Sequence, residues 1–382
     1  MKILHLISDH QVIERTLGVY ESIFPGCNEV LVFSPKEKPF KRLKNDYKGK
    51  VVYWENLESM AREYDYTNIT YVIAHYMSME KIDFIKYVPS DIHVCWEIYG
   101  YDLYNQFLLP LGLELYYEPR YKYAKYPIIS HYFDTLLNFF LELRGAKYCL
   151  KWQKKNQFRY ISSRINSIQY CCMYDAKFVE DFSGRVIPSY EIFNYSLDEV
   201  LGDLAGLPFF EGKDILVGNS ASLSNNHLYV KKFLEKITLS DDTSLIVPLS
   251  YGGSDKYAKK VESEFSKSFN GKVSFLKEYM PLHEYNKIFL RLKAIILSAW
   301  RQESQGTAIM AFYMGIKVFM SERSPLYKWF INCGFIVFTI ESATQESFEL
   351  PLNHDEKNHN RRIVLERYNP QRIAQTLKEN IV

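Results

Sequence analysis

The segment Ile215–His227, ILVGNSASLSNNH, places small polar residues directly after a short apolar run. A strand that ends at Gly218 could turn tightly or let a ligand approach its backbone, because glycine carries no Cβ. Ser224 and Asn225 are suitable residues to cap a following helix. A capped turn alone would leave several polar groups without a role, so we predict a ligand site formed by Gly218, Asn219, Ser220, Asn225, Asn226 and His227.

A second polar loop follows an apolar run in Ser298–Ile309, SAWRQESQGTAI. Gly306 and Thr307 would open a helix, whose unpaired N–H groups and positive dipole suit a diphosphate. At the same loop Arg301 would add a positive charge and Glu303 would accept hydrogen bonds from sugar hydroxyls, with Gln305 at the helix start. Neither GxGxxG nor GxxxxGKS/T occurs, which disfavours a dinucleotide oxidoreductase and a P-loop enzyme.

Between these two loops, the segment Ile246–Gly253 (IVPLSYGG) predicts another strand that runs into a polar loop. Tyr251 could stack on a base or a sugar, and the paired glycines would allow a close approach. A plain turn explains this segment equally well.

Ionisable residues follow predicted strands in the first half of the chain. A group transfer to a hydroxyl needs a carboxylate or an imidazole to take the proton, and the candidates are Asp9, His75, Glu97 and Asp102. For each of them a helix cap or a buried hydrogen bond is the alternative. No Asp-x-Asp triplet occurs. Because paired carboxylates commonly hold Mg²⁺ at a nucleotide diphosphate, we expect a site that needs no metal cofactor.

Short apolar runs alternate with amphipathic stretches along both halves, which predicts βαβ units and mostly parallel sheets. In the first half, a helix is expected at Val12–Ile23 and strands at Lys2–Ile7, Glu29–Phe33, Val51–Tyr53, Tyr71–Ala74 and His93–Trp96. In the second half, strands are expected at Asp214–Val217, Leu245–Leu249, Val273–Phe275, Ala294–Ser298 and Lys317–Met320. Helices are expected there at Asn226–Ile237, Lys256–Phe269, His283–Leu292, Gly306–Met314 and Pro370–Ile381.

The pattern predicts an α/β protein of two Rossmann-like domains, residues 1–205 and 206–382, facing across a cleft. Open parallel sheets bind ligands beyond the carboxyl ends of their strands, which is where both polar loops fall. The 47 basic and 45 acidic residues nearly balance, so general nucleic-acid binding is not expected. The six cysteines form no CxxC pair, and the apolar N-terminal run is too short for a secretory signal, so we expect free thiols in the cytoplasm.

Residues 116–160 are richer in basic than in acidic residues and include an aromatic and leucine-rich helix candidate at Ile128–Leu143. An ordinary core helix with solvated basic flanks explains this composition. Docking onto an anionic membrane surface is the alternative, because basic and aromatic side chains together favour lipid headgroups.

Four pieces of the sequence resemble the family that transfers 4-acetamido-4,6-dideoxygalactose (Fuc4NAc) from its TDP derivative in enterobacterial common antigen synthesis. They are VGNS with the downstream SN-x-H, the VP-x-x-Y segment, the QGT helix start and the W-x-x-x-G-x-DLY segment at Trp96–Tyr104. The resemblance covers most of the chain and is best from Asp214 to about Phe330.

This resemblance implies a GT-B fold and a TDP-sugar donor bound mainly by the C-terminal domain. It also implies a polyprenyl-diphosphate-linked saccharide as acceptor, and a place at the inner face of the plasma membrane. Two departures, Ser304 before Gln305 and Glu97 where a histidine is expected, leave room for another sugar or acceptor. The rival interpretations are a nucleotide-sugar epimerase of the same architecture and a non-catalytic sugar-binding module.

Overall fold

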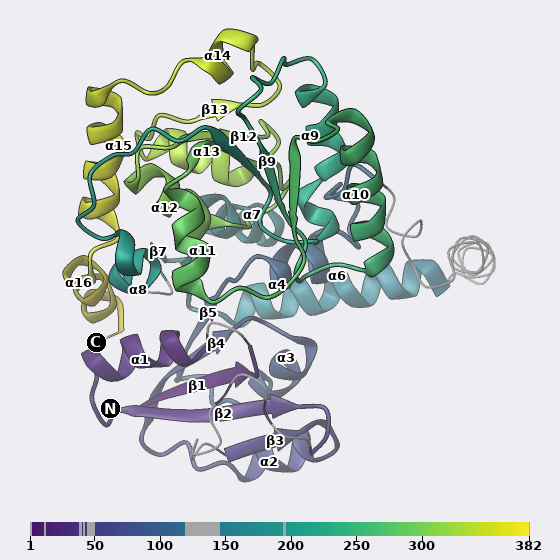
Figure 1. The fold of residues 1–382 in the computed structure, drawn as a ribbon. Coiled ribbons are helices and arrows are strands. Elements are labelled where there is room, and N and C mark those ends of the chain that lie inside the picture. Colours follow the sequence, from purple (N-terminus) through teal and green to yellow (C-terminus); the bar gives the residue numbers. More distant parts are fainter. Residues whose placement is uncertain are drawn as a thin grey trace. The chain divides into compact units, whose positions relative to one another are not determined.

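The computed structural model describes residues 2–10, 13–37, 40, 43, 50–118, 146–193 and 196–381, with the backbone alone for residues 146–153. The chain divides into two compact units (Figure 1). The first comprises Met1–Leu113, Leu150–Leu197 and Tyr368–Val382, and the second Glu114–Cys149 and Asp198–Arg367. The last helix therefore belongs to the unit that contains the first strand. The helix candidate Ile128–Leu143 lies outside the described residues.

The first unit contains a parallel sheet of seven strands in the order β3-β2-β1-β4-β5-β6-β7. Its central strands are apolar on both sides, as expected of a parallel sheet covered by helices on both faces. The strands are β1 (Lys2–Ser8), β2 (Asn28–Ser34), β3 (Lys50–Tyr53), β4 (Ile69–His75), β5 (His93–Glu97), β6 (Ser167–Tyr170) and β7 (Ser189–Glu191).

The second unit contains a parallel sheet of six strands in the order β10-β9-β8-β11-β12-β13. The strand order reverses at β8, which pairs with β9 on one side and β11 on the other. The strands are β8 (Asp214–Val217), β9 (Leu245–Pro248), β10 (Val273–Leu276), β11 (Leu292–Leu297), β12 (Lys317–Met320) and β13 (Phe338–Thr339).

Helices connect the strands of both sheets. Those of the first unit are α1 (Ile13–Ile23), η1 (Trp54–Asn56), α2 (Leu57–Glu63), α3 (Met79–Ile85), α4 (Tyr101–Leu103), η2 (Tyr104–Leu108), α6 (Ala146–Arg164), α7 (Met173–Ser183) and α16 (Pro370–Ile381). Those of the second are α8 (Leu197–Leu201), η4 (Gly202–Leu204), η5 (Leu223–Asn225), α9 (His227–Leu234), α10 (Asp255–Ser268), α11 (Leu282–Phe289), α12 (Gln305–Tyr313), α13 (Pro325–Asn332), α14 (Gln345–Glu349) and α15 (His354–Arg367).

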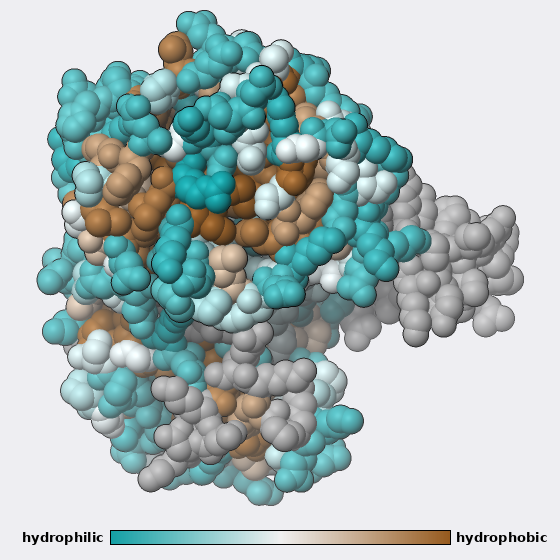
Figure 2. Space-filling model, in the orientation of Figure 1, coloured by the Kyte–Doolittle hydropathy of each residue, from teal (hydrophilic) through white to brown (hydrophobic). Residues whose placement is uncertain are grey.

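Hydrophilic side chains cover much of the visible face of the second unit, and hydrophobic ones gather between its helices (Figure 2). Among the described residues, no helix is both long enough and apolar enough to cross a membrane.

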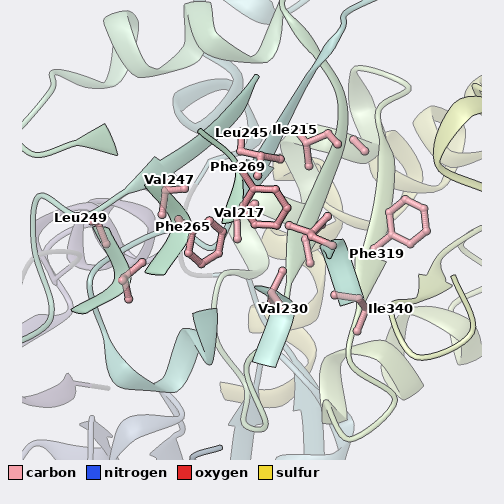
Figure 3. Packing of buried hydrophobic residues seen from close by; sticks show 14 of the residues in the cluster. Ile215, Val217, Val230, Leu245, Val247, Leu249, Phe265, Phe269, Phe319 and Ile340 are labelled. Atoms are coloured by element: carbon pink, nitrogen blue, oxygen red, sulfur yellow. The ribbon is translucent and has the colours of Figure 1, made fainter. Parts of the chain in front are cut away.

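The core of the second unit forms where α9 and α10 pack against the sheet (Figure 3). Helix α10 begins after Ser254, whose hydroxyl accepts a hydrogen bond from the Tyr257 N–H at 3.3 Å. The helix then buries Tyr257, Val261 and Phe265, which are spaced four residues apart and so share one face. Phe265 meets Val217 and Val247 within the same cluster. The apolar spacing of this helix thus fixes which side of it faces the strands.

Helix α12 is buried almost all round, with seven of its nine residues inaccessible. At its C-terminal end, Arg361 of α15 donates from Nε to the Tyr313 carbonyl at 2.6 Å. A cation at this end of a helix complements the negative pole of its dipole. The N-terminal end begins at Gln305, after Ser304 in the left-handed conformation (φ 69°).

The elements expected from the sequence are found within a few residues of their predicted bounds. Asp214–Val217, Lys317–Met320 and Pro370–Ile381 are found with the same bounds. Strands β6, β7 and β13 were not predicted, because they are four residues or fewer in length and carry little apolar pattern. No bounds were predicted for helices α2–α4, α6–α8 and α13–α15 either.

Phe265→Ala should lower the free energy of unfolding by about 3–5 kcal/mol, because it deletes a fully buried ring from the core of the second unit. Urea denaturation measures the change. The exposed neighbour Ser266→Ala serves as the control and should stay within about 0.5 kcal/mol of the parent. Equal effects of the two substitutions would contradict this packing.

Candidate functional site

Two polar loops of the second unit begin at the same edge of its sheet. Strands β8 and β11 are parallel neighbours, and the Gly218 N–H donates to the Ile296 carbonyl at 2.9 Å. The loops that follow Val217 and Leu297 therefore lie beside each other at the carboxyl ends of the strands. This is also the point where the strand order reverses, the usual ligand position of open α/β sheets.

Gly218 is required by the fold of the first loop. Its φ is 71°, and a Cβ at this position would lie 2.8 Å from Asn225 Oδ1 and 2.9 Å from His227 Nε2. Asn225 folds the loop back on itself: its Oδ1 accepts from the Asn219 N–H at 3.0 Å, and its Nδ2 donates to Ser220 Oγ at 3.1 Å. Four of the residues predicted for this loop are thus brought together.

The expected helix caps are wrong. Helix α9 begins at His227, and the residue before it, Asn226, is in the left-handed conformation (φ 50°). Ser224 and Asn225 lie one turn earlier in η5 and donate or accept elsewhere. The reason is that both side chains are bonded elsewhere: Asn225 to Asn219 and Ser220 in its own loop, and Ser224 to Glu303 in the neighbouring one.

Asn226 ties the first loop to the second. Its Nδ2 donates to the Ser298 carbonyl at 3.1 Å, and its Oδ1 accepts from the Tyr117 N–H at 2.8 Å. The side chain is buried; the hydrogen bond to Ser298 is shielded from water, and the one from Tyr117 is partly so. Asn226 is therefore a structural bridge between three segments of the second unit.

His227 is fully buried, and burial lowers its pKa to about 3. Its Nδ1 lies 3.2 Å from the Tyr257 hydroxyl. Within the described part of the chain, Nε2 has no hydrogen-bond partner. The imidazole is thus neutral, and Nε2 lies near Gly218 as an unused polar atom beside the loop.

The second loop carries a pair of opposite charges. Arg301 and Glu303 form an ion pair, with Nη2 3.1 Å from Oε2, and both side chains are largely buried. Ser224 Oγ donates to the same carboxylate oxygen. Glu303 therefore accepts a hydrogen bond from the hydroxyl of Ser224 in the neighbouring loop, whereas the sequence predicted sugar hydroxyls as its donors.

The first turn of α12 is open at Gly306. A Cβ on Gly306 would meet no atom within 4 Å, although most of the helix is buried. Thr307 is partly exposed next to it, and Gln305 is buried. The positive end of this helix is thus the part of α12 that a ligand could reach.

A third loop, which follows β9, completes this edge. The Ala221 N–H donates to the Tyr251 carbonyl at 2.7 Å. A Cβ on Gly253 would lie 1.8 Å from the Ala221 carbonyl oxygen, so only glycine permits this approach. The Tyr251 side chain is 50% exposed. Burial, and then the nearby Glu303 carboxylate, raise the pKa of Tyr251.

Tyr285 of α11 belongs to the same region and was not predicted. Burial raises the pKa of the Tyr285 hydroxyl, the neighbouring Tyr251 adds to this, and Thr307 acts in the opposite direction. Tyr285 thus lies close to both a loop tyrosine and the start of α12. Its segment, LHEYNKIF, is an ordinary amphipathic helix with no motif, so the sequence held no signal for it.

The four ionisable candidates of the first unit differ in exposure. Strands β1, β4 and β5 are neighbours, so Asp9, His75 and Glu97 follow or end strands at one edge of the sheet. Asp9 is partly exposed, and its Oδ1 accepts from the Leu43 N–H at 3.0 Å. His75 and Glu97 are 1% and 0% exposed and touch each other, with Nδ1 2.5 Å from Oε2.

Asp102 is a buried acceptor. It receives hydrogen bonds from the Met77 N–H at 2.9 Å, Trp96 Nε1 at 2.8 Å and the Tyr99 N–H at 3.1 Å. These contacts join the ends of β4 and β5 to α4. Burial raises the pKa of Asp102, and these hydrogen bonds oppose the rise. The geometry fits the structural alternative weighed for this residue.

Comparisons with known proteins place these features in context. The family model described as 4-alpha-L-fucosyltransferase, glycosyl transferase group 56, matches residues 142–348, over half of the chain. A glycosyltransferase from Rickettsia africae superposes with a TM-score of 0.64 at 13% identity, over 99% of this chain and 97% of that one. A search of curated proteins returns no match.

Two further solved structures share the fold. Anabaena HepE, in complex with UDP and glucose, has a TM-score of 0.60 at 11% identity, over 100% of this chain and 99% of that one. Sucrose-phosphate synthase from Thermosynechococcus elongatus has a TM-score of 0.66 at 10% identity, over 99% and 98%.

Gly218→Ala should destabilise the second unit by about 2–4 kcal/mol, because it adds a steric clash to the strain of a left-handed alanine. Gly271→Ala is the matched control: its φ is 75°, but a Cβ there would meet no atom within 4 Å. That variant should lose about 1–2 kcal/mol. Chemical denaturation compares the two, and equal losses would show that the Asn225 and His227 contacts do not restrict the loop.

Proposed function

Since the chain belongs to the 4-alpha-L-fucosyltransferase family, glycosyl transferase group 56, it is a glycosyltransferase, and we propose that its second unit binds the sugar donor. The fold is GT-B, with two parallel-sheet domains, as the sequence predicted. The donor that we propose is a sugar nucleotide, bound at the loops after β8, β9 and β11.

The observation that carries this proposal is the open first turn of α12 beside the Gly218 loop. N–H groups at a helix start hold phosphate oxygens well, because the helix dipole adds to their hydrogen bonds. Gly306 offers room for the phosphates, and Thr307 supplies a hydroxyl donor. Arg301 lies in the same loop, although Glu303 already balances much of its charge. Backbone amides would therefore carry most of the neutralisation.

Tyr251 and Tyr285 would complete the donor site. A half-exposed ring at the carboxyl edge of a sheet suits stacking on a flat base. Tyr251 is such a ring, and Tyr285 brings a hydroxyl close to Thr307. Support for a nucleotide donor also comes from Anabaena HepE, which was solved with UDP and with UDP-glucose.

For the donor and acceptor we propose a TDP-linked amino-dideoxysugar of the Fuc4NAc type and a polyprenyl-diphosphate-linked saccharide. This rests on the resemblance of the VGNS and SN-x-H residues to the family that uses these substrates. Such an acceptor would bring the protein to the inner face of the plasma membrane in bacterial surface polysaccharide synthesis. The basic stretch from Arg120 to Arg144 lies outside the described residues.

In the reaction, the acceptor hydroxyl forms a bond to the sugar carbon while the bond from that carbon to the diphosphate breaks. The hydroxyl proton passes to a base, and the nucleotide diphosphate leaves with its charge held by the amides of α12. We propose Asp9 as that base, because it is partly exposed, whereas His75, Glu97 and Asp102 are buried. An epimerase would instead convert the donor alone, so product formed without acceptor would favour that rival.

Gly306→Asp should weaken TDP binding by about 30-fold or more, near 2 kcal/mol, because it places a negative charge at the phosphates. Gly306→Asn is the matched control, since it has the same shape without the charge, and the open space at this position accepts both. Isothermal titration calorimetry measures both affinities. An unchanged affinity in the aspartate variant would remove α12 from the donor site.

Asp9→Asn should lower kcat for sugar transfer by about 10²–10⁴, with little change in TDP affinity. Asparagine keeps an oxygen acceptor for the Leu43 N–H, so the loop should retain its geometry. A radiolabelled-donor assay measures transfer. Wild-type rates in this variant would exclude Asp9 as the base.

A further inference from the structure

A row of polar side chains, buried from His5 through His75 to Glu97, crosses the first unit beneath its carboxyl edge. It begins at Asn28, whose Nδ2 donates to Glu21 Oε2 at 2.7 Å and to the Phe24 carbonyl at 2.8 Å. The amide oxygen of Asn28 is therefore the atom that faces His5 Nε2, at 3.0 Å. Since an amide oxygen can only accept, His5 carries a proton on Nε2.

The position of the proton on His5 determines which nitrogen of His75 carries a proton. Burial, followed by the effect of His75, lowers the pKa of His5 to about 3, so its ring is neutral and Nδ1 is a lone pair. His5 Nδ1 lies 2.8 Å from His75 Nε2, which must then be the donor. Burial, with Lys81 adding to it, holds the pKa of His75 well below its ordinary value. Nδ1 of His75 is consequently unprotonated.

This lone pair faces the Glu97 carboxyl. His75 Nδ1 and Glu97 Oε2 are 2.5 Å apart, a distance at which a lone pair and a carboxylate would repel each other strongly. Both atoms are buried and, among the described residues, neither has a hydrogen-bond partner, so a proton shared between them would satisfy both. The row already directs the other ring protons away, so that proton comes from Glu97.

The neighbouring charges favour the same assignment. The Asp102 carboxylate receives two backbone N–H groups and an indole N–H, which suits the charged form. Within the described residues, no backbone N–H donates to the Glu97 carboxyl. The Lys81 side chain is fully buried and donates to the carbonyls of His75 and Tyr76. Burial lowers the pKa of Lys81 to about 7, and the Asp102 carboxyl opposes this fall. The positive charge of Lys81 at most balances Asp102, so a charged Glu97 would leave an excess negative charge in the interior.

We propose that Glu97 is a protonated carboxylic acid at neutral pH and serves as a positioning residue, whose proton fixes His75 and His5 in one tautomer each. The row then holds β1, β4 and β5 together below the edge that carries Asp9. The link to acceptor chemistry rests on the proposed function, but the protonation state does not.

Burial raises the pKa of Glu97 to about 8, while the Tyr99 hydroxyl and Lys81 act in the opposite direction. The other titratable groups that face Glu97 are Tyr20 and Cys95, and burial raises the pKa of both, that of Cys95 to about 12. Folded Glu97 keeps its proton where an unfolded glutamate, with a pKa of about 4.3, has lost it. The proton on Glu97 therefore contributes fully to the free energy of unfolding at low pH. This contribution is lost as the pH rises from about 4.3 to about 8.

Spectroscopy of the full-length protein tests the protonation state directly. The infrared difference between wild type and Glu97→Gln at pH 6.5 should contain the carbonyl stretch of a carboxylic acid, and this band should fade above pH 8. Nitrogen-15 NMR of the imidazoles should show His5 and His75 as neutral rings protonated at Nε2. Carboxylate bands alone, or a doubly protonated His75, would overturn the proposal.

Unfolding experiments test the positioning role with matched variants. The side-chain amide that Glu97→Gln introduces can donate to His75 Nδ1 as the acid does, so this variant should keep the wild-type urea midpoint near pH 5 and have a higher midpoint than the wild type at pH 8, where the wild type has lost the contribution of its proton. Glu97→Ala leaves His75 Nδ1 without a donor and should lower the midpoint. Asp102→Asn should also lower it, because its NH₂ group would face N–H donors. A Glu97→Gln variant as unstable as Glu97→Ala would show that the charge is needed.

The rate of sugar transfer in the Glu97→Gln variant distinguishes a positioning role of Glu97 from a catalytic one. Glu97→Gln should keep most of the transfer rate, whereas a loss of about 100-fold or more with an unchanged fold would make Glu97 the base and overturn the proposal. A complete absence of transfer in the wild type would count against the proposed function alone, since the infrared and NMR results need no substrate.

Discussion

The side-chain amide of Asn226 joins the loops at the carboxyl edge of the second unit's sheet. It binds the carbonyl of Ser298 on one side and the N–H of Tyr117 on the other, so three distant segments share one polar group. The loops after β8 and β11 owe their spacing to this bridge and to the Ser224 contact with Glu303. Because the bridge is buried, its loss would leave main-chain groups without partners in a place that water does not readily reach. The geometry around Gly218 and Gly306 depends on it.

The sequence predicts the architecture well and the site in part. Continuous apolar runs such as Asp214–Val217 reveal buried parallel strands, and polar residues at their ends indicate the edge at which we propose the donor site. The same reasoning assigns Ser224 and Asn225 to helix capping, which is wrong. The partner that Ser224 binds instead is Glu303, which lies 79 residues further along the chain. Local propensity cannot foresee such long-range partners.

The first unit shows the same limit for ionisable groups. His75, Glu97 and Asp102 look alike in the sequence, since each follows an apolar run. Their roles differ because burial and N–H donors differ: Asp102 has three donors and Glu97 contacts an imidazole. Tyr285 is the opposite case. No motif marks this residue in the sequence, yet the fold places it near the start of α12. Exposure and hydrogen-bond direction thus decide chemistry that residue type leaves open.

Helix α12 is immobilised on nearly every side, and Arg361 satisfies the carbonyl at its far end. Its electric field is therefore oriented without any ligand, and in the proposed donor site binding would require no rearrangement of the helix itself. Such a site would not adapt to a differently shaped leaving group by moving α12. Variation in what is recognised would instead arise from the more exposed surroundings, of which the half-exposed ring of Tyr251 is the clearest example.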